Sequence, residues 1–396
     1  MYKMKENVFW TGGIDWDIRN FHGYSTPFGT TYNSYLIIDD KPTVIDTVKK
    51  YCADEMIRRI SENIDPSKIE YIISNHTEMD HSGAIEELLE YCPNAEIVCS
   101  PKGAEELKRH FKKDWNFKVV KSGDTLNIGK RELVFQQIPM VHWPDSMVTY
   151  SPHDKILFSN DAFGQHYASS ERFADEIGLD FIFKEAAKYY ANIVLPYGNQ
   201  TLKALDAVGG LDIDMICTSH GINWRGKENI TKLIELYYKW ARHETENKVV
   251  IVYYTMWRST EKMARKLFEL VELAGIPVKL VNLKETHISD IMADILDSKV
   301  LIMGSPVLNS RILPDVAALL MYMKGLKPKG RTALTFGSYG WARIAYKELE
   351  SSLQEAGFNL PADGAYVQFV PDEGELEELK SFVSIIQDVF GSEVIG

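Results

Sequence analysis

The densest group of chemically active residues lies in the segment SNHTEMDHSG, at positions 74–83. It offers two imidazoles and two carboxylates within six positions: His76, Glu78, Asp80 and His81. Imidazole nitrogens and carboxylate oxygens are common ligands of transition metals. The apolar run IEYIIS before the segment is typical of a strand, and side chains leaving a strand end can point toward one centre. We expect Gly83 to let the chain turn sharply into a helix. The four side chains together predict a metal site in this segment.

Three further candidate ligands follow later strand-like runs. His142 comes after LVFQQIPMV, Asp161 after KILFSN, and His220 after DMICTS. Loops at one end of a scaffold are where sites are commonly assembled. A lone His or Asp at a strand end is more often a structural residue or a cap, so the metal role depends on the joint pattern.

The elements that must position these residues change in pattern near residue 245. Before it, short apolar runs separated by turn residues alternate with helical stretches, which predicts a mixed α and β region with two main sheets. After it, five apolar runs are each followed by a helical pattern, and they begin at Val249, Val278, Val300, Thr332 and Ala365. Continuous apolar strands suit a parallel sheet covered on both faces, as in the doubly wound flavodoxin-like fold. We therefore expect one domain at 1–245 and another at 246–396.

Composition narrows the class of protein. The 396 residues are 45% hydrophobic and 25% charged, which is typical of a soluble globular protein of two or three domains. Acidic residues outnumber basic ones 56 to 44, and the net charge of -12 would repel nucleic acid and anionic lipid. No apolar run approaches membrane-spanning length and the first residues lack an export signal, so we expect a cytoplasmic protein without membrane association. The four cysteines form no CxxC pair and are expected to be buried or incidental thiols.

The spacing of the metal candidates resembles the HxHxDH motif of the metallo-β-lactamase superfamily, which is followed by distant His, Asp and His. Glu78 stands where that motif carries its second His. An anionic carboxylate oxygen is a hard ligand, which suits a site that must hold ferric as well as ferrous iron. Glu78 therefore favours iron over zinc. The Glu-for-His change, followed by a flavodoxin-like domain, resembles the flavodiiron proteins from about residue 5 to the end of the chain. The resemblance implies an α/β and α+β protein: a metallo-β-lactamase-like αββα sandwich, then a five-stranded parallel sheet.

The resemblance also implies two irons with a bridging oxo or hydroxo ligand. One iron would be held by His76, Glu78 and His142, and the other by Asp80, His81 and His220, with Asp161 between them. Whether His81 reaches the metal stays open, because members of the family differ there. His22, in the aromatic segment RNFHGY, is implied to line the substrate pocket as a catalytic residue.

Three loops of the second half are candidates for binding FMN. The loop at 255–260 supplies hydroxyls and backbone amides at a helix start, which suits a phosphate, and it resembles the flavodoxin pattern TxTGxT except at Trp257 and Arg258. The loops from Gly304 and Gly337 offer small residues for close approach, and Tyr339 and Trp341 can stack on a flavin ring. No GxGxxG fingerprint follows the first strand, which disfavours a dinucleotide. The expected contacts are Thr255, Met256, Trp257, Arg258, Ser259, Thr260, Ser305, Pro306, Val307, Leu308, Asn309, Ser338, Tyr339, Gly340 and Trp341.

The family resemblance implies an oxidoreductase that reduces dioxygen to water, nitric oxide to nitrous oxide, or both, in order to remove these gases. It implies a homodimer or a dimer of dimers, with the FMN of one subunit beside the irons of the other. The electron donor would be a separate rubredoxin, a reduced deazaflavin or a nicotinamide-dependent reductase. The sequence does not rank the two gases or identify the donor.

Two other functions compete with this interpretation. A zinc hydrolase of the metallo-β-lactamase type with an appended flavin domain would use a metal-bound hydroxide, and Glu78 argues against it. A flavin electron carrier with a vestigial metal site is the other alternative, and the complete ligand set argues against that. Metal analysis distinguishes all three.

Overall fold

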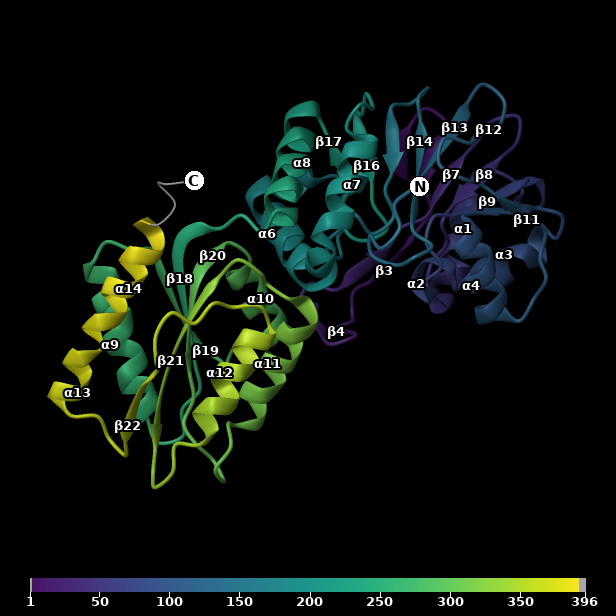
Figure 1. Ribbon diagram of the computed structural model, residues 1–396. Coiled ribbons are helices and arrows are strands. Elements are labelled where there is room, and N and C mark those ends of the chain that lie inside the picture. Colours follow the sequence, from purple (N-terminus) through teal and green to yellow (C-terminus); the bar gives the residue numbers. More distant parts are fainter. Residues whose placement is uncertain (1, 392–396) are drawn as a thin grey trace. The chain divides into compact units, whose positions relative to one another are not determined.

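The computed structural model describes residues 2–391, which form two compact units (Figure 1). Unit 1 comprises the described residues up to Tyr190 together with Tyr197–Ala241. Unit 2 comprises the short segment Ala191–Pro196 and the described residues from Arg242 onward. Among residues 2–391, no helix has the length and apolar character needed to cross a membrane.

Unit 1 is built on two large mixed sheets. The order of the first is β1 (Tyr2–Lys5), β2 (Val8–Trp10), β7 (Tyr35–Ile37), β8 (Thr43–Ile45), β9 (Tyr71–Ser74), β10 (Glu96–Cys99) and β11 (Phe117–Val119). The order of the second is β12 (Thr125–Asn127), β13 (Glu132–Gln137), β14 (Met147–Ser151), β15 (Ile156–Phe158), β16 (Met215–Cys217) and β17 (Trp224–Arg225). Two short ribbons pair β3 (Gly13–Asp15) with β6 (Thr30–Tyr32) and β4 (Asn20–Phe21) with β5 (Tyr24–Ser25).

The two sheets pack face to face because successive side chains of a strand point to opposite faces. In β9, Ile73 belongs to the apolar core between the sheets, whereas its neighbour Ile72 belongs to a second core beneath helices. Phe135 and Phe158 of the second sheet meet Ile73 in the first of these cores. The result is four layers, helix, sheet, sheet and helix, as expected from the sequence (Figure 1).

Helices cover the outer faces of both sheets. Those whose apolar residues pack on the first sheet are α1 (Ala53–Ser61), α3 (Ile85–Tyr91) and α4 (Pro101–Phe111), and the short α2 (Met79–Ser82) precedes α3. The other helices of unit 1 are α5 (Ala174–Ile177), α6 (Leu179–Tyr189), α7 (Gly198–Val208) and α8 (Lys227–Ala241). Leu205 and Tyr237, on α7 and α8, pack over Val148 and Leu157 of the second sheet.

Unit 2 is a doubly wound parallel sheet. Its strand order is β19 (Val278–Asn282), β18 (Glu246–Tyr253), β20 (Ser298–Gly304), β21 (Thr332–Tyr339) and β22 (Ala365–Gln368), and every neighbouring pair is parallel. One face carries α9 (Ser259–Leu273), α13 (Glu373–Glu378) and α14 (Lys380–Gly391), and the other carries α10 (Ile288–Leu296), α11 (Pro314–Leu326) and α12 (Ala345–Glu355) (Figure 1). The order 2-1-3-4-5 is that of the flavodoxin-like fold, which confirms this part of the expected fold class.

Some details differ from the sequence-based expectation. The first strand of unit 2 begins at Glu246 rather than Val249, because pairing of Glu246 with Ser298 on the neighbouring strand β20 extends it into polar sequence. The last strand ends at Gln368, although the apolar run AYVQFV that predicts it continues to Val370. All four cysteines are buried and unpaired, as expected.

Candidate metal centre and flavin site

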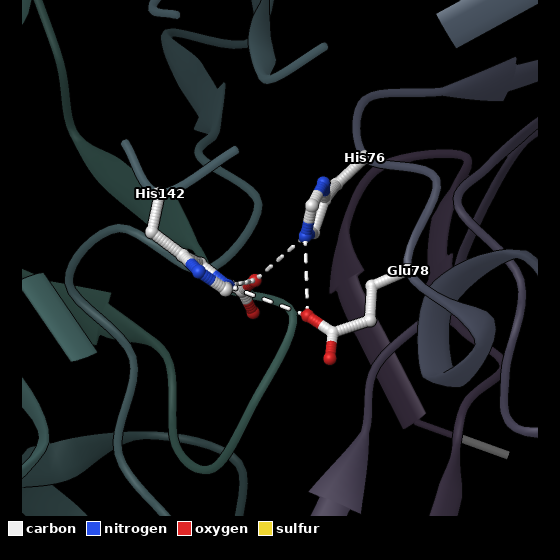
Figure 2. Close-up of side chains that lie close together, drawn as sticks. His76, Glu78 and His142 are labelled. Carbon is white, nitrogen blue, oxygen red and sulfur yellow. Dashed lines mark hydrogen bonds and ion pairs between the residues drawn. The ribbon is translucent and has the colours of Figure 1, made fainter. Parts of the chain in front are cut away.

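The structure brings together all seven of the predicted metal ligands, in two neighbouring groups. Within each group, one donor atom from every residue lies within 4.8 Å of the others. The first group is His76, Glu78, His142 and Asp161, and the second is Asp80, His81 and His220. Figure 2 shows the side chains of His76, Glu78 and His142 turned toward a common point.

The ligands come from loops of both sheets. His76 follows β9 of the first sheet, whereas His142, Asp161 and His220 follow β13, β15 and β16 of the second. Because each loop leaves the carboxyl end of its strand, the packing of the two sheets sets the distance between the two halves of the site. The site therefore depends on the sandwich as a whole.

Asp161 links the two groups. Its Oδ2 lies 3.1 Å from Nε2 of His142 and 3.5 Å from Nε2 of His76, both in the first group. Its Oδ1 lies 3.1 Å from Nε2 of His81 and 3.5 Å from Nε2 of His220, both in the second. One carboxylate oxygen thus faces each group, which is the arrangement of a carboxylate that bridges two ions.

Buried polar atoms without hydrogen-bond partners test whether this site fits metal ions. His76 Nε2, both carboxylate oxygens of Asp80, both ring nitrogens of His81 and Oδ1 of Asp161 are buried and lack such partners. Buried polar groups are nearly always satisfied, because leaving one unpaired costs free energy. Bound cations would satisfy these atoms apart from one ring nitrogen of His81, because an imidazole offers one nitrogen to a metal. A mixed imidazole and carboxylate donor set suits transition metals such as iron.

Electrostatics in the cluster favour carboxylates that stay ionised. Burial alone would raise the pKa of Asp161, but the neighbouring imidazoles of His81, His142 and His220 hold it well below its usual range. Burial would lower the pKa of His81, yet the carboxylates of Asp80 and Asp161 raise it to about 9. The carboxylates that raise the pKa of His81 would also attract cations.

Local structure explains how the segment at 76–81 converges. Glu78 is the residue before the first turn of α2, and Asp80 and His81 lie within that turn, so the ligands converge through a helical turn rather than by strand alternation. The expectation that Gly83 is needed for a sharp turn was wrong. Its φ of -60° is open to any residue, but a Cβ there would lie 2.2 Å from the carbonyl oxygen of Met79. Glycine is needed for close packing, not for a turn.

Asp145 supports the first group and was missed from the sequence. Its carboxylate oxygens lie 3.1 Å and 3.2 Å from Nδ1 of His76, and one of them accepts the backbone N–H of Thr77 at 2.7 Å. A carboxylate on Nδ1 keeps the proton there and leaves Nε2 of His76 free to bind a metal. Asp145 belongs to no recognisable motif, so only the fold reveals it.

Aromatic side chains flank the second group. Phe21 packs edge-on to His220, with ring centroids 5.7 Å apart, and stacks on His22 at 4.6 Å. The ring of His22 is 69% exposed, and its Nδ1 lies 3.8 Å from Oε1 of Glu78. His166, which was not singled out from the sequence, is buried and forms a hydrogen bond with the Thr30 hydroxyl. Its ring centroid lies 4.8 Å from that of His220.

Unit 2 carries a cavity of about 490 Å³ at the carboxyl ends of its strands. Among the predicted flavin contacts, those that line it are Met256, Trp257, Ser259, Pro306, Val307, Leu308, Asn309, Ser338, Tyr339, Gly340 and Trp341. Trp257 and Trp341 are each 88% exposed at its rim. Ser310, Ala342, Phe369 and Val370 also line it and were missed from the sequence. The last two follow β22, a strand end whose residues carry no phosphate or flavin motif.

Four predicted contacts, Thr255, Arg258, Thr260 and Ser305, do not line the cavity. Ser305 and Thr260 instead make hydrogen bonds inside the loops, to the Pro306 carbonyl and the Ser338 hydroxyl. Arg258 has a φ of +67°, so it keeps the left-handed backbone that a glycine would favour at this position of the flavodoxin pattern. The buried Oγ1 of Thr255 lacks a partner just before α9, which fits a phosphate held at the helix start.

Comparison with known proteins agrees with this architecture. Residues 30–221 match the family described as ODP family beta lactamase, and residues 251–382 match the flavodoxin family. The chain is 44% identical to a nitric oxide reductase of Moorella thermoacetica, over 94% of each chain. The solved rubredoxin oxygen:oxidoreductase of Desulfovibrio gigas is 42% identical, with a TM-score of 0.96 over 100% of this chain and 99% of that one.

The solved flavodiiron protein of Giardia intestinalis is 36% identical, with a TM-score of 0.95 over 98% of this chain and 96% of that chain. The matched residues extend over both units, so the similarity includes the metallo-β-lactamase-like domain and the flavodoxin-like domain. This chain belongs to the flavodiiron protein family.

Proposed function

We propose that this protein is an oxidoreductase that reduces dioxygen to water, nitric oxide to nitrous oxide, or both. Residues 1–245 would form the di-iron domain and residues 246–396 the FMN domain. The observation that carries the proposal is the pair of ligand groups that share Asp161, each with its donor atoms within 4.8 Å. The names of the relatives, a nitric oxide reductase and a rubredoxin oxygen:oxidoreductase, support both gases as substrates.

Two irons and a reduced FMN, when bound, would supply the electrons for either reduction. The seven ligands would hold the irons: His76, Glu78 and His142 one of them, Asp80, His81 and His220 the other, and Asp161 both. His81 has no hydrogen-bond partner on either ring nitrogen, which supports its inclusion as a ligand. A bridging oxo or hydroxo ligand would complete the centre.

The surrounding residues position this centre and control access to it. Asp145 would hold His76 in the tautomer that presents Nε2 to the metal. Phe21 would keep bulk water away from the side of His220. His22, beside Glu78 but exposed, would line the entry and stand within reach for proton exchange with solvent.

In unit 2, the cavity rimmed by Trp257 and Trp341 would hold the isoalloxazine, and the loop before α9 would hold the phosphate. Electrons would enter from a separate donor, such as a rubredoxin, a reduced deazaflavin or a nicotinamide-dependent reductase. We further propose a cytoplasmic homodimer or dimer of dimers in which the FMN of one subunit serves the irons of another. Light scattering of an active monomer would contradict that assembly.

The test is metal and flavin analysis of anaerobically purified protein, followed by gas consumption with a chemically reduced donor. We expect about two irons and one FMN per chain, with turnover of at least one gas. Asp161→Asn should lose iron and turnover but keep FMN, whereas Asp65→Asn, on the surface of the same unit, should keep both. Zinc in place of iron, together with hydrolase activity, would refute the proposal.

A further inference from the structure

A small apolar cavity of about 20 Å³ lies in unit 1, beside the second sheet. Val148 on β14 and Leu157 on β15 form its floor, and Leu205 and Val208 on α7 and Tyr237 on α8 cover it. All five side chains are buried. The cavity therefore belongs to the packed interface between the sheet and its outer helices.

The two side-chain hydroxyls in the cavity wall each make a hydrogen bond with the backbone. The hydroxyl of Thr201 donates to the carbonyl of Tyr197 at 3.0 Å, and the hydroxyl of Tyr237 accepts the backbone N–H of Phe163 at 2.6 Å. A volume of 20 Å³ exceeds the roughly 10–15 Å³ that one water needs, but a buried water also needs two to four polar partners. An apolar cavity of this kind stays dry and takes up small apolar molecules.

The cavity reaches the chain segments that carry two of the proposed ligands. Val141, in its wall, directly precedes His142, and Ala162, also in its wall, directly follows Asp161. His142 Nε2 and Asp161 Oδ2 lie 3.1 Å apart within the first ligand group. The same short stretches of backbone thus face the ligand cluster on one side and the cavity on the other.

We propose that this cavity binds a small apolar gas molecule, of the class of dioxygen and nitric oxide, and supplies it to the metal centre. Both gases are uncharged and accept hydrogen bonds weakly, so they partition from water into a dry apolar space. The binding site follows from the cavity itself, whereas the supply role rests on the proposed gas-reducing function.

Xenon under pressure is a direct probe of the binding site, because it needs neither electrons nor turnover. Crystals of the holoprotein should show a xenon atom between Val148, Leu205 and Tyr237. Ala204→Leu, which adds side-chain atoms from α7 into the cavity, should exclude it. Ala207→Leu makes the same change at an exposed position of the same helix and should bind xenon as the wild type does. Val208→Ala enlarges the cavity and should raise xenon occupancy. This second variant tests the binding site even if Ala204→Leu fails to fold.

The supply role predicts a matching kinetic effect. At equal iron and FMN content, Ala204→Leu should lower kcat/KM for the gas by roughly threefold or more relative to Ala207→Leu, with kcat at saturating gas retained. Absence of xenon from the wild-type cavity would overturn the proposal, and so would a filled cavity without any change in kcat/KM. If the holoprotein reduced neither gas, the proposed function would fail, yet xenon in the cavity would still support the binding site.

Discussion

Replacing Asp145 with asparagine tests how much the carboxylate behind His76 contributes to metal binding. In the wild type the carboxylate accepts two donors, Nδ1 of His76 at 3.1 Å and the N–H of Thr77 at 2.7 Å. The amide oxygen of asparagine can still accept one of them, so the variant loses the charge rather than the whole contact. A hydrogen bond to a charged group contributes about 1–1.5 kcal/mol more than a neutral one, which corresponds to roughly tenfold in affinity.

Loss of a supporting partner of a metal-bound imidazole costs about 10–100-fold in metal affinity, so the two arguments agree. We expect Asp145→Asn to release one of its two irons to a chromogenic ferrous chelator at about tenfold lower chelator concentration than the wild type. The second iron should be unaffected, because Asp145 contacts His76 and Thr77, whereas Asp80, His81 and His220 form the other ligand group.

The control for this experiment is Asp65→Asn, which also alters a carboxylate that accepts a backbone N–H, here that of Ser67 at 3.0 Å. Asp65 is exposed and belongs to neither ligand group. Anaerobic chelator titration followed by iron analysis is the assay, and far-UV circular dichroism checks the fold. If Asp145→Asn and Asp65→Asn release iron at the same chelator concentration, Asp145 does not orient His76 and the reasoning is wrong.

Four further outcomes follow from the structure. Arg131→Met should lower the free energy of unfolding by about 3–5 kcal/mol in urea denaturation, because it leaves the buried carboxylates of Asp39 and Asp154 without their shared cation. Burial would raise the pKa of Asp39, but hydrogen bonds from backbone N–H groups and from Arg131 outweigh burial and lower this pKa. The ionised carboxylate therefore stabilises the folded protein fully above the unfolded pKa near 3.8, and this stabilisation is lost as the pH falls through the lower folded pKa. Denaturation against pH should accordingly show that the advantage of the wild type over Asp39→Asn shrinks below pH 3.8. Arg258→Gly should stabilise the protein by about 1 kcal/mol and keep FMN fluorescence quenching, because it removes a side chain from a left-handed position. Anaerobic chelation should lower the melting transition of unit 1 in calorimetry and leave that of unit 2 unchanged, since both ligand groups lie in unit 1.

Much of the fold was accessible from the sequence because its signals are local. Five apolar runs with helical patterns between them define the parallel sheet of unit 2, and the strand order follows from the known fold of that pattern. The segment Ala191–Pro196 was not predictable, because periodicity does not tell which unit a short apolar stretch will join. The short helix α2 was also missed, since the helix was expected to begin only after the turn at Gly83.

The residues of the site were likewise predictable only where a local sequence signal marks them. The compact motif at 76–81 carries its own signal, and His142, Asp161 and His220 were found because they follow strand-like runs. Asp145 lies 69 positions from His76 and belongs to no motif, so only tertiary packing reveals it. The backbone of Arg258 is another example, because its φ of +67° cannot be inferred from an arginine.

The ligands divide between the two sheets, and this determines when the proposed site could first bind a metal ion. During translation the segment 76–81 is synthesised long before His220. At that stage four of the ligands are present, but the second sheet has not formed. Strands β13 to β16 must be synthesised and must join their partners before the remaining three donors arrive. We therefore expect iron insertion to be a late event, which a cell that assembles this protein would have to keep apart from translation.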